Sequence, residues 1–565
     1  MNNEKLENLL NVSLSVTDSE RERSAILDTG YSKNEQRWNL IIRYSKSLDE
    51  LRALSEEIEV LELLGGFAII TTPQELVEKI ADLPSVIFVE MPKRLNFAIN
   101  EGKASSCVNL VQQRGGLNLT GRGVLVGIVD SGIDITHPDF RNADGTTRIL
   151  RLLNQGDKEY LAEELNEILL NDRQKAKQFE STGHGTAVAG IVAGNGRASD
   201  GRYTGMAPDS ELVIVKLGVP DSNDFPRTTQ LMAGVDYLVR LSMELERPIA
   251  INISFGMNYG SHSGQSLLEE YLDFVSDIGQ CSICVGSGNE GGSPIHTMLE
   301  VTNLGETYDR EFTVSTYQAT LNLQIWKYYS DTCRIVLRHP GGQQITLEPD
   351  QLQTMRYRLG SVTLLVYYGR PLPYAQWQEI FIDFIPNGTY IDSGVWKIFL
   401  TPIKIVRGIY QFWLPAAATL NRGTGFTRPT PDYTLTIPST SLKVITVGAY
   451  DSLKETYATF SGRGPTSFLP VNKPDLVAPG VGIYSTANGG GYQSVTGTSF
   501  ATPFVTGAAA LLMQWGIVEG RDPFLYGQKL KAYFIRGARQ LLGYEVYPNS
   551  VVGWGALCVR DSLPR

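Results

Sequence analysis

The sequence lacks several features that would assign it to a special class of protein. No apolar run is long enough to cross a bilayer, and the first residues, 1–7, contain neither the basic nor the apolar segment of a secretion signal. Basic residues are not in excess, because 50 Lys and Arg stand against 60 Asp and Glu, for a net charge of −10. This balance argues against nucleic acid as the main partner. We therefore expect cytoplasmic synthesis, no membrane span and no nucleic-acid partner.

Cysteine is also scarce, with five residues in the whole chain. An odd number of scattered cysteines does not predict a disulfide framework, and we expect all five to be reduced thiols. Cys281 and Cys284 have the spacing of a metal or redox pair. They lie on an apolar run with no second pair nearby, which favours buried core residues.

The length and composition predict an ordinary globular protein with a large core. A chain of 565 residues has room for three or four domains, and its contents of 42% hydrophobic and 19% charged residues are unexceptional. The chemistry must therefore be found in local motifs.

The segment Gly497–Pro503, with the sequence GTSFATP, is the first such motif. A small-residue apolar run follows it to Met513, and Pro503 fits best in the first turn of a helix. Ser499 is thus expected at a helix N-terminus, where free N–H groups favour the negative charge that a serine nucleophile generates. The alternative is a serine that merely caps a buried helix.

Two further segments favour the catalytic interpretation. Residues 126–130 are an apolar run ending in Asp130, as expected of a buried parallel strand with the carboxylate at its carboxyl end. His184, in Gly183–Thr186, opens a second helix of small residues. The resulting chain order is Asp, His, Ser, one of the known orders of a serine-protease triad.

With these motifs the chain resembles the subtilisin-like serine proteases, or subtilases. Four matching motifs occur in the family's order: Asp130-Ser131-Gly132, His184-Gly185-Thr186, Gly286-Ser287-Gly288-Asn289-Glu290 and Gly497-Thr498-Ser499-Phe500-Ala501-Thr502-Pro503. The resemblance implies an α/β fold with a parallel catalytic sheet. It also implies catalytic roles for Asp130, His184 and Ser499, with Asn289 in the oxyanion hole.

The resemblance further assigns substrate binding to Ser254, Phe255 and Gly256, which follow the apolar run 249–253. Phe255 replaces the family's leucine, and we expect it to narrow the substrate pocket. The alternative is a simple strand end. No metal takes part in the expected chemistry and we expect no cofactor. Asp139 matches a frequent calcium ligand of subtilases, but the companion loop 194–205 does not fit the calcium-binding pattern.

The region before residue 98 predicts a small domain of its own. Strands are expected at 38–44, 60–64, 67–71 and 86–90, with helices at 47–59 and 72–80, in an α/β sandwich. Subtilase propeptides have this shape, so residues 1–97 are expected to act as an inhibitory, chaperone-like propeptide. The alternative is an unrelated regulatory domain. We expect self-cleavage between Arg94 and Asn100 in an extended tail, after which the propeptide stays bound without a covalent link.

Two segments exceed what a minimal subtilase contains. Residues 154–179 are charged and predict a helical surface insertion without identifiable chemistry. Residues 294–431 contain many short strand-forming segments separated by turns, which predicts an inserted β-sandwich or jelly roll. Its four tryptophans are expected in its core rather than in a sugar-binding surface. The catalytic domain is thus expected in two parts, 98–293 and 432–565, with the inserted block packed on both it and the propeptide.

This architecture resembles the clostridial germination proteases called Csp. That resemblance implies limited proteolysis of a spore cortex-lytic enzyme precursor, and a spore-associated location. Two alternatives remain: a pseudoprotease-like sensor or scaffold silenced by a retained propeptide, and a general degradative intracellular subtilase.

Overall fold

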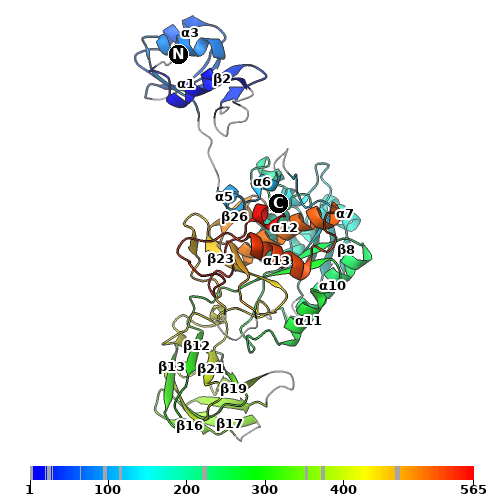
Figure 1. Ribbon diagram of the computed structural model, residues 1–565, viewed down its shortest axis with the longest axis vertical. Helices are drawn as coiled ribbons and strands as arrows, with labels where there is room; N and C mark the ends of the chain where they lie inside the picture. The colour runs from blue at the N-terminus through cyan, green and yellow to red at the C-terminus, as the bar shows by residue number, and fades with distance from the viewer. Residues whose placement is uncertain are drawn as a thin grey trace. The chain divides into compact units, whose positions relative to one another are not determined.

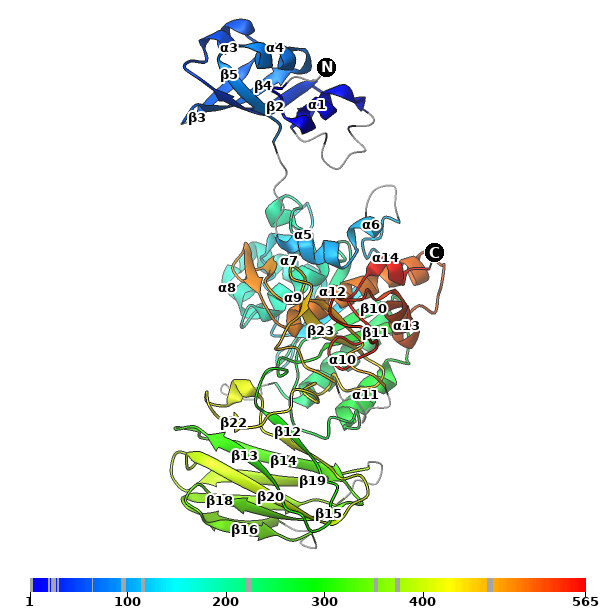
Figure 2. The same ribbon diagram turned by 60° about the vertical axis from the view of Figure 1, so that its left-hand side comes forward.

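The computed structural model describes residues 4–18, 21, 27, 30–63, 65–92, 98–112, 117–218, 226–349, 354–370, 376–464 and 471–564. The chain divides into two compact units, Met1–Phe97 and Ala98–Arg565. The second unit contains both a parallel-sheet domain and a β-sandwich (Figures 1 and 2).

The first unit is a five-stranded sheet packed against short helices. Its elements are α1 Asn8–Ser15, β1 Tyr31–Ser32, β2 Arg37–Tyr44, α3 Asp49–Leu54, β3 Glu59–Leu63, β4 Phe67–Pro73, η1 Gln74–Leu76, α4 Val77–Asp82 and β5 Val86–Glu90. The strands run in the order β1-β2-β4-β3, and β5 pairs with β2. The strand expectations are close to the observed bounds, but α3 stops at Leu54 because Ser55 has extended backbone. The predicted second helix begins late, since β4 continues to Pro73.

The second unit contains a nine-stranded sheet. Its strands are β6 Leu125–Asp130, β7 Ile149–Asn154, β8 Glu159–Leu161, β9 Glu211–Lys216, β10 Ile249–Ile253, β11 Cys281–Gly286, β23 Ile445–Asp451, β24 Thr456–Tyr457 and β25 Leu476–Pro479. Strands β23, β11, β10, β6, β9 and β7 are parallel neighbours in that order. The parallel arrangement brings the carboxyl ends of β6, β10 and β11 to one edge, which is where open α/β sheets place their sites.

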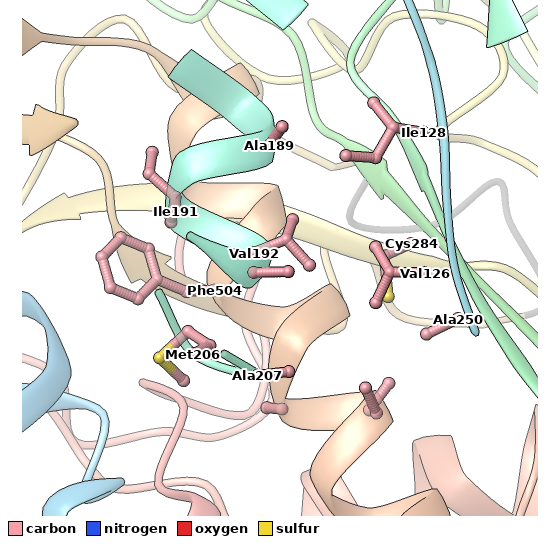
Figure 3. Packing of buried hydrophobic residues seen from close by; sticks show 14 of the residues in the cluster. Val126, Ile128, Ala189, Ile191, Val192, Met206, Ala207, Ala250, Cys284 and Phe504 are labelled. Atoms are coloured by element: carbon pink, nitrogen blue, oxygen red, sulfur yellow. The ribbon is translucent and has the colours of Figure 1, made fainter. Parts of the chain in front are cut away.

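Helices cover both faces of this sheet. The remaining elements of the domain are α5 Ala98–Ser105, α6 Asn109–Gln112, η2 Pro138–Phe140, α7 Ala162–Asn171, α8 Arg173–Ala176, η3 Lys177–Phe179, α9 His184–Ala193, η4 Arg197–Ser199, α10 Thr228–Glu244, α11 Leu267–Val275, β26 Ile483–Thr486, β27 Tyr492–Val495, α12 Thr498–Met513, η6 Gln514–Val518, α13 Gly527–Gly537 and α14 Val559–Ser562. Alternate residues of β6 point to opposite faces: Val126 and Ile128 pack with α9 and α12, whereas Leu125 and Val129 pack with α10 and α11. Figure 3 shows α9 and α12 side by side, with Ile191 and Phe504 on the side of the pair away from Val126 and Ile128.

Helix α12 and its continuation η6, Thr498–Val518, form the one described helix that is long and apolar enough to span a membrane. From the sequence alone we expected no apolar run of this length. The helix is a core element of the fold, because 83% of the apolar window is buried.

The segment after β7 differs from its expected form. We expected residues 154–179 to be a helical surface insertion, but β8 first adds an antiparallel strand to the sheet and α7 begins only at Ala162. Tyr160, Leu165 and Phe179 are buried in the main core. The apolar residues at these spacings therefore attach the segment to the sheet, despite its high overall charge.

The inserted block forms two antiparallel sheets around their own apolar core. One sheet has the order β12-β21-β14-β19-β18-β17 and the other β16-β15-β20-β13-β22. The elements are β12 His296–Glu300, β13 Tyr308–Val314, β14 Leu321–Tyr328, β15 Thr332–Arg338, β16 Gln344–Leu347, β17 Thr354–Leu359, β18 Val362–Tyr368, β19 Trp377–Pro386, β20 Gly394–Lys404, β21 Ile409–Trp413, η5 Ala417–Thr419 and β22 Gly425–Phe426. Trp326, Trp377, Trp396 and Trp413 are all buried, as expected of core residues.

Candidate functional site

The site begins with a carboxylate and an imidazole held by two different elements. Asp130 is the last residue of β6 and is fully buried, and His184 is the first residue of α9. The distance between His184 Nδ1 and Asp130 Oδ1 is 2.8 Å. This contact fixes the proton on Nδ1 and leaves Nε2 available as a base.

Ser499 lies in the first turn of α12, as the sequence predicted. Its Oγ donates to the carbonyl oxygen of Ser254 at 3.3 Å rather than to His184. The ring of the next residue, Phe500, lies 5.2 Å from the His184 ring. A rotation about χ1 of Ser499 is the movement that would present Oγ to a base, and such contacts are often loose before substrate binds.

Pro503 has a role that the sequence interpretation missed. It lies in the second turn of α12, not the first, and has no N–H to donate to the carbonyl of Ser499. That carbonyl instead accepts a hydrogen bond from Ser254 Oγ at 3.1 Å. The proline thereby leaves an acceptor through which the substrate-binding segment attaches to the helix of Ser499.

Asn289 follows β11 and lies beside the start of α12. Its Oδ1 accepts hydrogen bonds from Thr498 N at 3.0 Å and from Thr498 Oγ1 at 3.1 Å. Because only the amide oxygen can accept from the backbone N–H, the Nδ2 group must face the other way. A Cβ added at Gly497 would lie 3.6 Å from this Nδ2, so the NH₂ group is near the turn that precedes Ser499.

The segment Ser254–Gly256 leaves β10 next to these groups. Phe255 and Gly256 line an apolar cavity of about 310 Å³, and the Phe255 ring is 6.2 Å from the His184 ring. Other apolar walls come from Leu217, Leu231, Met257, Leu268 and Ile437. The cavity is suited to an apolar side chain.

Nearby carboxylates favour the charged form of His184, and their effect on its pKa outweighs the opposite effect of burial. Burial lowers the pKa of His184, but the Asp130 carboxylate, and to a smaller extent Glu180, raise it above its ordinary value. An imidazole stabilised in its charged form is a stronger base.

Glu180 is a residue that the sequence interpretation missed. Its buried carboxylate accepts hydrogen bonds from the backbone of Ser181, Thr182 and Thr186, and from the hydroxyls of Thr186 and Ser131. Burial opposes its ionisation, yet these bonds lower the pKa of Glu180. It therefore joins the turn after Asp130 to the start of α9. The available signal was an acid placed just before His184, where a helix N-terminus favours negative charge.

We expect Glu180→Gln to move the acid limb of the pH–rate profile to lower pH. The negative charge of Glu180 raises the pKa of His184, so its removal lowers that pKa, and neutral His184 then persists in more acidic solution. A pH series of kcat/KM on a peptide substrate measures this. Glu163→Gln, at an exposed position of α7, is the control and should not shift the limb. An unmoved limb in Glu180→Gln would contradict the assignment.

Comparison with known proteins identifies the two parts of the chain. The model of the Csp protease B prodomain matches residues 4–93, and that of the subtilase family matches residues 121–364 and 415–555. The chain belongs to the subtilase family. The subtilase is similar to the Clostridium perfringens CspB protease, whose structure aligns with a TM-score of 0.77 at 35% identity, over 82% of this chain and 97% of that one.

Curated relatives of this subtilase are more distant. It is 24% identical to the minor extracellular protease Vpr of Bacillus subtilis, over 79% of this chain and 52% of that protein. It is 24% identical to the serine protease AprX of the same organism, over 80% of this chain and 68% of that protein. The chain thus spans about half the length of Vpr.

Asp139, which the sequence matched to a frequent calcium ligand of subtilases, accepts hydrogen bonds from other parts of the protein. Asp139 is buried, and its Oδ1 accepts from Ala198 N at 2.8 Å while its Oδ2 accepts from Tyr492 Oη at 2.9 Å. Within the described ranges, no group of three His, Cys, Asp or Glu side chains is arranged to hold a metal ion. The carboxylate of Asp139 joins η4 and β27 to the rest of the subtilase domain.

The expectation of five reduced cysteines is wrong for one pair. Cys107 and Cys558 form a disulfide at a sequence separation of 451, with 4.9 Å between their Cα atoms. Such a separation gives no sequence signal, because only the fold brings the two ends together. Cys281, Cys284 and Cys333 are free and buried, as expected of core residues.

Proposed function

We propose that this protein is a serine endopeptidase in which Ser499 is the nucleophile, His184 the general base and Asp130 the residue that orients the imidazole. The observation that carries the proposal is the 2.8 Å contact between Asp130 and His184, at the sheet edge that also holds Ser499 and Asn289. The test is cleavage of a protein substrate by the wild type and by the Ser499 variant described in the Discussion.

The mechanism follows from these positions. His184 Nε2 takes the proton from Ser499 Oγ as Oγ attacks the scissile carbonyl, and later gives a proton to the leaving amine. The buried carboxylate of Asp130 stabilises the imidazolium that forms. The backbone N–H of Ser499 and the Asn289 Nδ2 group stabilise the oxyanion, and loss of one such donor typically costs roughly 3 kcal/mol of transition-state stabilisation.

We propose further that the substrate is the precursor of a spore cortex-lytic enzyme, activated by limited proteolysis during germination in a spore-associated location. The support is the similarity to the CspB protease, together with the match to the Csp protease B prodomain. Incubation of the purified protein with such a precursor tests the proposal. One discrete product with gained lytic activity supports it, whereas progressive degradation points to a general degradative protease.

The first unit is proposed to be a propeptide that remains bound after cleavage. Leu61, Leu63 and Phe67 lie on one face of its sheet, and strand register places Phe88 on that face too, because Phe67 and Phe88 both pair with Arg43. These four side chains are exposed. An apolar face of this kind is suited to a protein partner.

We expect self-cleavage between Arg94 and Phe97, which lie outside the described residues. The window expected from the sequence reached Asn100, but α5 begins at Ala98, and a helix cannot enter a protease cleft as an extended strand. N-terminal sequencing of the mature form measures the position. Two fragments should separate on a denaturing gel and co-elute in size exclusion, and a new N-terminus well inside either unit would refute the prediction.

A further inference from the structure

The segment that binds substrate continues directly into contacts with the inserted sandwich. After Ser254–Gly256, Met257 pairs with Ile437 in a two-residue antiparallel bridge, with N···O distances of 2.9 and 2.8 Å. The next residues, 258–262, form a loop that faces the sandwich sheet containing β14 and β21. This segment is therefore held from both sides, with the catalytic domain on one side and the inserted block on the other.

Gln324 of β14 holds the backbone of this loop. The side chain is 1% exposed. Its Oε1 accepts from Gly260 N at 3.0 Å, and its Nε2 donates to the carbonyl of Asn258 at 3.4 Å. A buried amide that satisfies a donor and an acceptor two residues apart fixes the position of the loop, because any displacement leaves buried polar groups unpaired.

Trp413 of β21 supplies a second contact. Its ring stacks on His262, with centroids 4.4 Å apart and planes 10° from parallel. His262 Nδ1 lies 2.7 Å from the carbonyl oxygen of Leu435, and Trp413 Nε1 donates to the carbonyl of Tyr433 at 3.3 Å. The far end of the loop is thus attached to the sandwich and to the strand-like segment that re-enters the catalytic domain.

A third contact reaches the oxyanion side of the site. Glu290, the residue after Asn289, is buried, and its Oε1 accepts from Ala417 N of η5 at 3.2 Å. The inserted block therefore touches both of the segments that flank Ser499.

We propose that the inserted sandwich is a positioning element of the active site, in which Gln324 and Trp413 set the register of Ser254–Met257 and so determine how well an extended peptide is aligned for attack. The inference rests on the proposed protease function. Gln324 and Trp413 contact neither substrate nor reacting atoms and act through the 254–262 segment, so they are positioning residues. Misplacing a substrate by about 1 Å can cost on the order of 10²-fold in rate.

The test compares two substrates in the wild-type protein and in Gln324→Met. This change keeps a similar volume and removes both hydrogen bonds to the loop, together with the long 3.5 Å bond that Gln324 Oε1 accepts from Trp326 Nε1. One substrate is an extended peptide p-nitroanilide, which must pair with the 254–257 segment. The other is p-nitrophenyl acetate, which is too small to do so. We expect kcat/KM for the peptide to fall about tenfold or more while the ester rate stays within about twofold.

Gln378→Met is the matched control. Gln378 is a buried glutamine of the same sheet, and its side chain bonds to Lys327 and to the carbonyl of Gly369, away from the loop. It should leave the ratio of peptide to ester activity unchanged. If Gln324→Met does not fold, Trp413→Phe, which retains an aromatic stack and loses the Nε1 bond, takes its place in the same ratio measurement.

An unchanged ratio of peptide to ester activity in the folded variant, including an equal fall for both substrates, would overturn the proposal. Failure of the proposed function itself is distinguishable, because the wild type would then cleave neither substrate.

Discussion

Ser499→Ala is expected to abolish proteolysis and leave a folded, full-length protein. The variant keeps Asp130, His184 and Asn289 in place but has no atom that can attack the scissile carbonyl. Loss of the nucleophile from a triad of this type lowers kcat on the order of 10⁶-fold. Because the same serine would cut the propeptide, the purified variant should run as a single band of about the full 62.3 kDa.

The measurement is cleavage of a protein substrate, with thermal unfolding as the check on folding. Ser254 lies beside Ser499 but is not proposed as a nucleophile, so Ser254→Ala is the control and should keep measurable activity. Undiminished cleavage by Ser499→Ala would remove the assignment. A wild type as inactive as the variant would favour the sensor or scaffold alternative.

Asp130→Asn is expected to lower kcat on the order of 10⁴-fold. The asparagine amide can donate to Nδ1 and so favour the tautomer with the proton on Nε2, which cannot accept the proton of Ser499. The carboxylate also raises the pKa of His184, so its loss lowers that pKa. The residual activity should therefore retain its acid limb at lower pH than in the wild type.

A pH series of kcat/KM in both proteins checks this result. Asp134→Asn makes the same substitution nearby, at a carboxylate that binds Thr136 and the amide of Gly489 rather than His184. Asp134→Asn should keep most of the wild-type kcat/KM, and the acid limb of its pH–rate profile should not shift. If Asp130→Asn retained wild-type kcat, the proposed role of the carboxylate would be wrong.

The sequence predicted the catalytic sheet because its central strands are continuous apolar runs, as buried parallel strands require. The strand ends at Asp130 and Ser254 and the small-residue helices after His184 and Ser499 follow from the same pattern. Such local patterns predict the folded structure correctly because the backbone geometry sets the side-chain periods of strands and helices.

What the sequence did not predict depends on contacts between distant segments. Glu180 acts through Ser131 and Gln324 acts through the loop at Gly260, which only the fold brings near. Pro503 leaves the carbonyl of Ser499 free, but the donor that uses this carbonyl is Ser254, which is distant in the sequence. The short strand β8 was missed because three residues of alternating burial carry too little periodicity to be distinguished from a helix turn.

The Cys107–Cys558 disulfide makes a closed covalent ring of almost the whole second unit. A force applied between the two chain ends that lie outside the ring passes through the sulfur atoms and bypasses the sheet. An unfolding motor that threads a polypeptide from one end would have to translocate two segments of the chain at once. Cleavage between Arg94 and Phe97, as proposed above, would leave only a short stretch of chain before Cys107, so exopeptidases would meet the crosslink after trimming that stretch. The ring therefore gives the second unit mechanical resistance in surroundings where the crosslink stays oxidised, and a reductant would remove that resistance without altering the residues of the catalytic site.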